Sequence, residues 1–134
     1  KIETKPLKQY FAVPVRSNYS DAIKICNDYY GVLPTITSDN ENYEAILACQ
    51  GNIPDNTTKG CWTGLNSRSN NWEYIDGTNV KSSLGFDGNG KPTRGIYPWT
   101  SMWNGQPDNA NGIERCVNVQ LNVEFEWNDV KCFE

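Results

Sequence analysis

The chain has 134 residues, a formal net charge of −4 and a sequence pI of about 4.8. This acidic balance argues against nucleic acid as a partner, because binding to phosphates needs a basic face. The absence of histidine removes the commonest general base and transition-metal ligand, but it leaves open the hard cations that prefer oxygen. No apolar run is long enough to span a membrane, and the first ten residues do not have the pattern of a signal peptide.

The length and composition predict a globular protein with a single domain over residues 1–134. Five cysteines in so short a chain indicate an oxidising compartment, and no two of them have the close spacing of a zinc knuckle. We therefore expect a secreted protein. The sequons that start at Asn18 and Asn56 agree with a glycoprotein, although a plain surface asparagine is the alternative at each position.

The first elements are expected to be a strand and a helix. Alternation in residues 10–15 predicts the strand. Residues 17–31 predict the helix, which Asn18 or Ser20 caps and Gly31 ends. Its apolar face would be formed by Ala22, Ile23, Ile25, Cys26 and either Tyr29 or Tyr30.

A short apolar run at residues 32–37 is expected to be extended, and a second helix is predicted at residues 38–51. Ser38 would cap this helix, Glu41 would complete a capping box, and Gly51 would end the helix. Helical spacing places on one side of it Tyr43, Ile46 and Leu47, with Gln50 as an optional fourth member.

The second half of the chain is typical of short strands and loops. Aromatic strands are predicted at residues 61–65 and 71–77, and two further strands at residues 116–121 and 125–132. Between them, residues 81–94 are rich in glycine, serine and asparagine and predict a long loop, a feature that is often functional. Two helices followed by short strands indicate an α+β fold.

Five oxygen-bearing side chains are spread over the loop after residue 103 and the last predicted strand: Gln106, Asp108, Glu114, Asn128 and Asp129. Three carboxylates and two amide carbonyls are a set that Ca²⁺ takes, whereas Mg²⁺ prefers stricter geometry and more water. A cis bond before Pro107 would turn both neighbouring side chains to the same side. The alternative is a solvated polar loop, because the same residue types also form turns.

The order of these residues resembles the C-type lectin domain. "QPD" at residues 106–108 is followed by a glutamate two residues before Cys116, and "WND" at residues 127–129 is followed by Cys132. The resemblance extends from residue 10 to residue 132, because it also includes "DAIKIC", "GVLPTITSDNEN", "WTGL" and "WEYIDG". It implies a C-type lectin-like fold, with two helices, short antiparallel strands, a long calcium-binding loop region and disulfide bonds.

The resemblance also implies roles for the oxygen-bearing residues. All five would hold one Ca²⁺, which accepts two neighbouring hydroxyls of a sugar. Asp108 and Glu114 would accept hydrogen bonds from those hydroxyls, and Gln106 and Asn128 would donate to them. The order "QPD" is similar to family members that bind galactose or N-acetylgalactosamine, in contrast to members with Glu-Pro-Asn.

This chain departs from the galactose-type pattern in its aromatic residues. No aromatic residue closely follows "QPD". Trp99 and Tyr97, which precede it, are the candidates for stacking on the sugar, whereas Trp103 and Trp127 are expected in the core. In the family, acidic residues hold an accessory calcium. An asparagine and an arginine stand at those positions here, so we expect no accessory calcium.

The resemblance implies a disulfide between Cys116 and Cys132. Cys26 matches a helix cysteine whose usual partner near the C-terminus has no counterpart in this chain. We suggest a second disulfide between Cys49 and Cys61, which leaves Cys26 as a buried thiol or as a link to another chain. The strand at residues 10–15 is our suggested replacement for the absent last strand.

The favoured hypothesis is a secreted, calcium-dependent lectin for galactose or N-acetylgalactosamine glycans. Single sites of this kind are weak, so homo-oligomers would supply avidity. The alternative is a protein-binding or ice-binding module that keeps the fold without the sugar function. An enzyme is not expected, because the carboxylates are better used as metal ligands and no nucleophile motif is present.

Overall fold

The computed structural model describes residues 8–51, 60–120 and 125–133. Two helices come first, as the sequence predicts: α1 (Tyr19–Asp28) and α2 (Asp39–Gln50). The strands and one short 3-10 helix follow: β1 (Gly60–Asn66), β2 (Glu73–Tyr74), η1 (Ala110–Gly112), β3 (Glu114–Gln120) and β4 (Glu126–Lys131). The predicted α+β class is confirmed.

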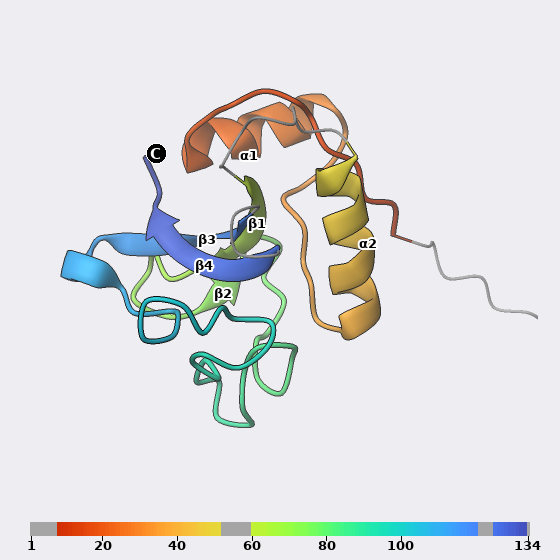
Figure 1. Cartoon of the computed structure of the whole chain (residues 1–134). Helices are drawn as coiled ribbons and strands as arrows, with labels where there is room; N and C mark the ends of the chain where they lie inside the picture. The colour runs from red at the N-terminus through yellow and green to blue at the C-terminus, as the bar shows by residue number, and fades with distance from the viewer. Residues whose placement is uncertain (1–7, 52–59, 121–124, 134) are drawn as a thin grey trace, which may run out of the picture.

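The four strands form one antiparallel sheet in the order β2-β1-β3-β4. In the pair of β3 and β4, Val117 lies opposite Asp129 and Asn118 lies opposite Asn128. Figure 1 shows α1 at one end of the molecule and the long segment between β2 and η1 at the other. The sheet therefore lies between α1 and the loop region, with α2 beside it, and its last two strands reach that region.

Local hydrogen bonds explain where both helices begin. Asn18, not Ser20, caps α1, because its side-chain oxygen accepts from the Asp21 N–H at 2.8 Å. At α2, the Ser38 hydroxyl accepts from the Glu41 N–H at 3.2 Å. The Glu41 carboxylate accepts in return from the Thr37 N–H at 2.9 Å, one residue before the cap. The expected capping box is thus present in a form shifted by one residue.

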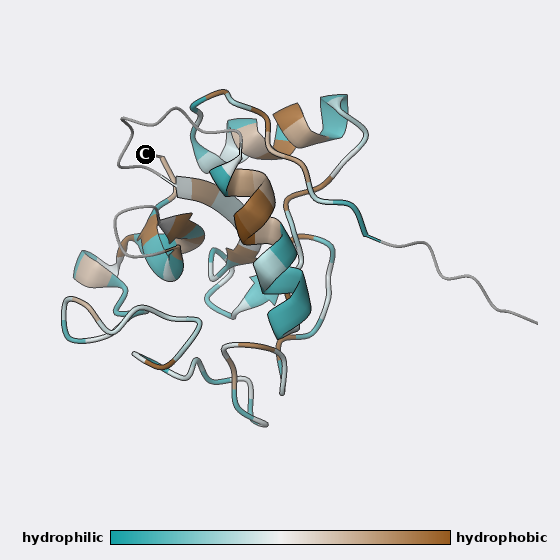
Figure 2. Cartoon of the chain, turned by 45° about the vertical axis from the view of Figure 1, so that its right-hand side comes forward, coloured by the Kyte–Doolittle hydropathy of each residue, from teal (hydrophilic) through white to brown (hydrophobic). Residues whose placement is uncertain are grey.

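The buried face of α1 includes most of the predicted residues, because Ala22 is buried and the partly buried Ile23 and Cys26 pack against the core, whereas the buried face of α2 differs from the predicted one. In α1 the buried residues are Tyr19 and Ala22, and the residue in a left-handed conformation after the helix is Tyr30, which is fully exposed. In α2 the buried residues are Asn42 and Cys49, whereas the predicted Tyr43 and Leu47 are exposed. Figure 2 gives the reason for α2, because its first turns are hydrophilic and its last turns hydrophobic, with no stripe along its length.

The larger core cluster is built around Trp99, which is fully buried. Its indole makes edge-to-face contacts with three rings, whose centroids lie 5.5–6.1 Å away: Trp72, Phe86 and Trp127. The Trp99 Nε1–H donates to the Gly85 carbonyl at 2.8 Å, so the indole N–H is satisfied in the core. This cluster fixes the start of the loop that leads to Gln106.

The predicted strand at residues 10–15 is wrong, because residues 8–18 belong to no strand. Pro14 has no N–H to donate to a neighbouring strand. Both suggested disulfides are present, one joining Cys49 to Cys61 and the other joining Cys116 to Cys132. Cys26 is a free, half-buried thiol, and burial raises its pKa. Among the described residues, no helix is long and apolar enough to cross a bilayer.

Candidate metal and ligand site

The five predicted oxygen ligands come from three segments that backbone hydrogen bonds hold together. The Gln106 N–H donates to the Thr100 carbonyl at 3.0 Å, and the Thr100 N–H donates to the Trp127 carbonyl at 3.0 Å. The Trp127 N–H donates in turn to the Pro98 carbonyl at 2.8 Å. The loop that carries Gln106 is therefore attached to β4 directly before Asn128.

The side chain of Gln106 lies at the centre of the group. The Gln106–Pro107 bond is cis. One terminal atom of the buried Gln106 amide lies 2.7 Å from Asp129 Oδ1, 2.9 Å from Asp108 Oδ1 and 3.1 Å from Asn128 Oδ1. All three neighbours are oxygen atoms, so an amide nitrogen in that position would donate to them, whereas an amide oxygen would need a cation among the four oxygens. With the oxygen there, the amide N–H donates to the Trp103 carbonyl at 3.4 Å.

Three carboxylates lie close together at the same place. Ligand oxygens of Asp108, Glu114 and Asp129 are all within 4.8 Å of one another. Burial, followed by the negative charge of Asp129, raises the pKa of the Glu114 carboxyl to about 7. Burial also raises the pKa of Asp129. Three carboxylates at these distances repel one another when they are ionised. A bound cation would offset this repulsion.

The donor set fits calcium. It consists of carboxylate and amide oxygens only, with neither the nitrogen nor the sulfur ligands that zinc prefers. The predicted residues Gln106, Asp108, Asn128 and Asp129 converge, and Glu114 joins them through its carboxylate. The structure thus brings together the whole set that the sequence suggested.

Asn109 braces the site, a role that the sequence analysis missed. Its backbone N–H donates to Asp129 Oδ2 at 2.6 Å, and its side-chain oxygen accepts from the Glu114 N–H at 3.1 Å. The Asp108 N–H donates to Asp129 Oδ1 at 3.2 Å, and the Ala110 N–H donates to Glu114 Oε1 at 3.2 Å. Two of these contacts join residues 20 or 21 positions apart and cannot be seen in the sequence, although asparagine before a glycine-containing turn is a weak signal.

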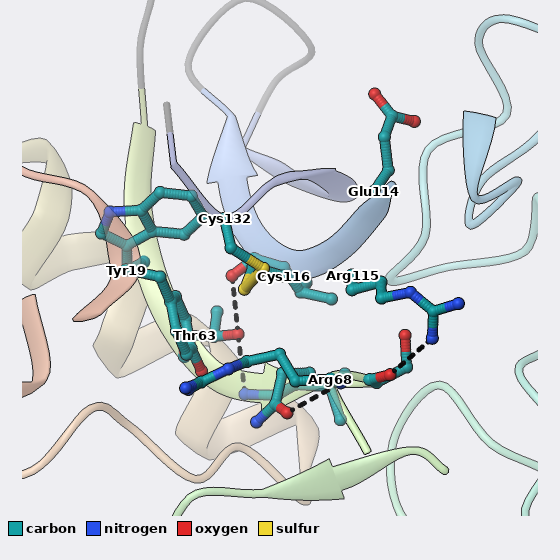
Figure 3. Close-up of a disulfide and its surroundings, with 12 residues drawn as sticks. Tyr19, Thr63, Arg68, Glu114, Arg115, Cys116 and Cys132 are labelled. Carbon is teal, nitrogen blue, oxygen red and sulfur yellow. Dashed lines mark hydrogen bonds between the residues drawn. A yellow bond between two sulfur atoms is a disulfide. The ribbon is translucent and has the colours of Figure 1, made fainter. Parts of the chain in front are cut away.

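Arg115 follows Glu114 on β3 but does not neutralise it. Figure 3 shows the Glu114 carboxylate and the Arg115 guanidinium extending in different directions from the strand. Arg115 Nη1 donates to the Ser67 carbonyl at 3.0 Å and to Asn70 Oδ1 at 2.8 Å. The guanidinium is thus engaged with the loop after β1 and not with the carboxylates of the site.

The aromatic residues near the site are placed differently from the prediction. Trp99 is wrong as a stacking residue, because its ring is fully buried in the core. Trp103 is wrong as a core residue, because 51% of its surface is exposed. Tyr97 is also 53% exposed, and its hydroxyl accepts from Asn42 Nδ2 at 3.0 Å. Trp127 is buried, as expected.

The two predicted glycosylation positions have different outcomes. Asn18 is partly buried and caps α1 through its side-chain oxygen. Asn56 lies outside the described residues. Glycosylation therefore stays a prediction at both positions.

Known proteins and a family profile match most of the chain. The profile of the family described as "Lectin C-type domain" matches residues 15–134. A perlucin-like protein of Mytilus galloprovincialis is 27% identical over 125 residues, which cover 92% of this chain and 68% of that protein.

Two solved structures are similar in fold. One is the C-type lectin CEL-I from Cucumaria echinata, with a TM-score of 0.62, 21% identity, and coverage of 87% of this chain and 76% of that one. The other is a herring type II antifreeze protein, with a TM-score of 0.58, 21% identity, and coverage of 90% of this chain and 79% of that one. At these identities the likeness concerns the fold alone.

Proposed function

Because this chain belongs to the C-type lectin domain family, we propose that it is a calcium-dependent lectin for terminal galactose or N-acetylgalactosamine. Its two helices, small antiparallel sheet and two disulfides are the C-type lectin fold. Carbohydrate binding is the activity that the family membership supports. The calcium dependence and the sugar class are our proposals, and they rest on the site.

The observation that carries the proposal is the convergence of oxygens on Gln106. Side-chain oxygens of Asp108, Asn128 and Asp129 lie within 3.1 Å of one terminal atom of its amide. With Glu114 added, these residues would hold Ca²⁺. Bound calcium would supply a positive centre on which two neighbouring sugar hydroxyls coordinate.

The protein's own residues would orient the sugar through hydrogen bonds. The carboxylates of Asp108 and Glu114 can only accept, whereas the amides of Gln106 and Asn128 can donate. Each hydroxyl of the pair would donate to a carboxylate and accept from an amide. A charge-assisted hydrogen bond of this kind contributes about 1.5–3 kcal/mol, so the order of acid and amide affects which hydroxyl pair is preferred.

Retention on a galactose-coated resin tests the proposal. We expect the protein to be retained in calcium and released by EDTA or by free galactose. The double variant Q106E/D108N exchanges the acid and the amide, and we expect it to bind calcium but to lose its preference for galactose over mannose. Retention that is indifferent to EDTA would contradict the proposal. Calcium binding without any glycan binding would favour the protein-binding or ice-binding alternative.

Secretion, a role without catalysis and the formation of homo-oligomers are also proposals. We propose secretion, because two disulfides persist only in an oxidising compartment. We propose a binding role without catalysis, because the three clustered carboxylates would be engaged with the cation. Homo-oligomers would raise the avidity for clustered glycans without any new contact.

A further inference from the structure

Arg115 connects two loops that are far apart in the sequence. Its Nη1 donates to the Ser67 carbonyl at 3.0 Å and to Asn70 Oδ1 at 2.8 Å, and its Nε–H donates to the Gly112 carbonyl at 3.3 Å. The Ser67 N–H donates in return to the Arg115 carbonyl at 2.8 Å. The half-buried Arg115 thus joins the loop after β1 to the turn at residues 108–112, which includes η1.

This turn holds two carboxylates of the proposed site. Three consecutive N–H groups, those of Asp108, Asn109 and Ala110, donate to side-chain oxygens of Asp129 and Glu114 at 2.6–3.2 Å. The directions of these N–H groups are set by the backbone of the turn. The two carboxylates therefore keep their places only while the turn keeps its conformation.

The turn is too short to maintain that conformation alone. η1 has three residues, and two of them, Asn111 and Gly112, have positive φ values of 57° and 71°. A single helical turn of this kind is not stable in isolation. The Gly112 N–H donates to the Asn109 carbonyl at 2.8 Å within the turn, and the Gly112 carbonyl accepts from Arg115 outside it. The guanidinium therefore anchors the end of the turn that follows the three N–H groups.

The positive charge of Arg115 does not by itself favour calcium. Arg115 directly follows the proposed ligand Glu114, and a like charge near a cation site opposes binding. Figure 3 shows the guanidinium extending away from the Glu114 carboxylate. The contacts of Arg115 and its charge therefore predict opposite effects on calcium affinity, and a titration can tell them apart.

We propose that Arg115 is a positioning residue for the calcium site. It holds the turn at residues 108–112, and the N–H groups of that turn then keep Asp129 and Glu114 in place before calcium binds. This inference rests on the proposed lectin function and deepens it, because it assigns the order of two ligands to one basic side chain. A planar guanidinium suits this task, since it donates to oxygens of two loops at once, whereas a lysine ammonium lacks the fork.

Calorimetric titration with calcium tests the proposal. For R115A we expect about tenfold weaker calcium affinity, the effect typical of residues that orient metal ligands. R115K keeps the charge but not the planar fork, and we expect it to show most of the same loss. R16A is the control for charge, because Arg16 is exposed in the segment before α1, and it should bind calcium as the wild type does.

A double-mutant cycle with Asn70 tests whether the effect passes through the contact. Asn70 has a φ of 74°, so N70G removes the side chain and keeps a suitable backbone. We expect N70G to weaken calcium binding less than R115A does, because Ser67 and Gly112 still accept from the guanidinium. The double variant R115A/N70G should bind no more weakly than R115A alone.

Hydrogen exchange in EDTA measures the positioning without any calcium. In R115A and R115K we expect faster exchange of the amides of Asp108, Asn109 and Ala110, with unchanged exchange in β1 and α2. A loss of overall stability would instead speed the exchange of all these amides together, and that result would contradict the local role.

The outcomes separate the two proposals. Calcium affinity of R115A equal to or above that of the wild type would show that the role of Arg115 is wrong, and the lectin function would stand. Wild-type affinity in R115K would also contradict the role, because charge alone would then be sufficient. If the wild type binds no calcium, the positioning role and the calcium-dependent lectin function are both wrong.

Discussion

Trp127 Nε1 donates a hydrogen bond of 3.0 Å to Oδ1 of Asn42, a residue that lies 85 positions earlier in the chain. Asn42 is almost fully buried in α2, and its Nδ2 donates to the Tyr97 hydroxyl at 3.0 Å. One amide therefore connects the second helix, the strand residue directly before Asn128 and the loop before the site. The sequence gives no sign of this role, because asparagine in a helix is usually exposed.

Replacing Asn42 by leucine should destabilise the fold. The variant N42L keeps the branched shape of the side chain but leaves the buried indole N–H of Trp127 without an acceptor. We expect a loss of about 2–3 kcal/mol in the free energy of unfolding, measured by urea denaturation. N40L is the control, because Asn40 is exposed on the same helix, and it should differ little from the wild type. Equal stability of N42L and N40L would contradict the connecting role of Asn42.

Removing the side chain of Asn109 should weaken calcium binding without removing a ligand. In N109G the backbone keeps its left-handed conformation, with a φ of 46° in the wild type, but Glu114 loses the amide oxygen that accepts from its N–H. We expect calcium affinity to fall about tenfold, because residues that orient metal ligands contribute effects of that size. Titration calorimetry measures it. N111G is the matched control at another exposed position with positive φ, and it should retain wild-type affinity.

The disulfide between Cys116 and Cys132 should matter for both stability and the site. It joins β3, which starts at Glu114, to the end of β4, which carries Asn128 and Asp129. For C116S/C132S we expect a loss of about 3 kcal/mol in the free energy of unfolding, together with weaker calcium binding. Denaturation at fixed calcium concentration measures the first, and titration the second. C26S, which removes the free thiol, should change neither; a comparable loss in C26S would point to an unrelated effect of the cysteine replacements.

The raised pKa of Glu114 predicts that the calcium-free protein becomes less stable as pH rises. The folded carboxyl has a pKa of about 7, because of burial and then the charge of Asp129, whereas the ordinary value of 4.5 applies to the unfolded chain. Between these values the folded state holds more protons, so the stabilising effect is complete below about pH 4.5 and is lost as pH approaches about 7.

Thermal unfolding in EDTA measures this dependence. We expect a higher melting temperature at about pH 5.5 than at about pH 7.5, and a smaller difference in E114Q, whose amide does not titrate over this range. E44Q changes an exposed glutamate of α2 and should keep the wild-type dependence. An E114Q variant with an undiminished pH dependence would assign the effect to other groups.

The convergence of the five oxygen-bearing side chains could be predicted from the sequence, because their order and spacing match a known pattern. "QPD", Glu114 and "WND" keep fixed positions relative to Cys116 and Cys132, so their resemblance to a known pattern is specific. The two helices could be predicted because their caps are local. The disulfide between Cys116 and Cys132 followed from the same resemblance, and the one between Cys49 and Cys61 confirms a suggestion about the remaining cysteines.

The rest depends on non-local contacts that a single sequence does not reveal. The exposure of Trp99 and Trp103 was interchanged in the prediction, because irregular loops have no hydrophobic period from which burial can be inferred. Residues 10–15 alternate like a strand, yet strand formation needs a partner edge as well as a pattern. The contacts of Asn109 and Asn42 likewise join residues 20 and 85 positions apart.

The backbone hydrogen bonds among Pro98, Thr100, Gln106 and Trp127 have a consequence for the entropic cost of calcium binding. They attach the loop that carries the proposed ligands to β4 through main-chain atoms that would take no part in holding a cation. Binding then needs little ordering of the chain, and its entropic cost is correspondingly small. We therefore expect calcium to enter the site without a slow folding step.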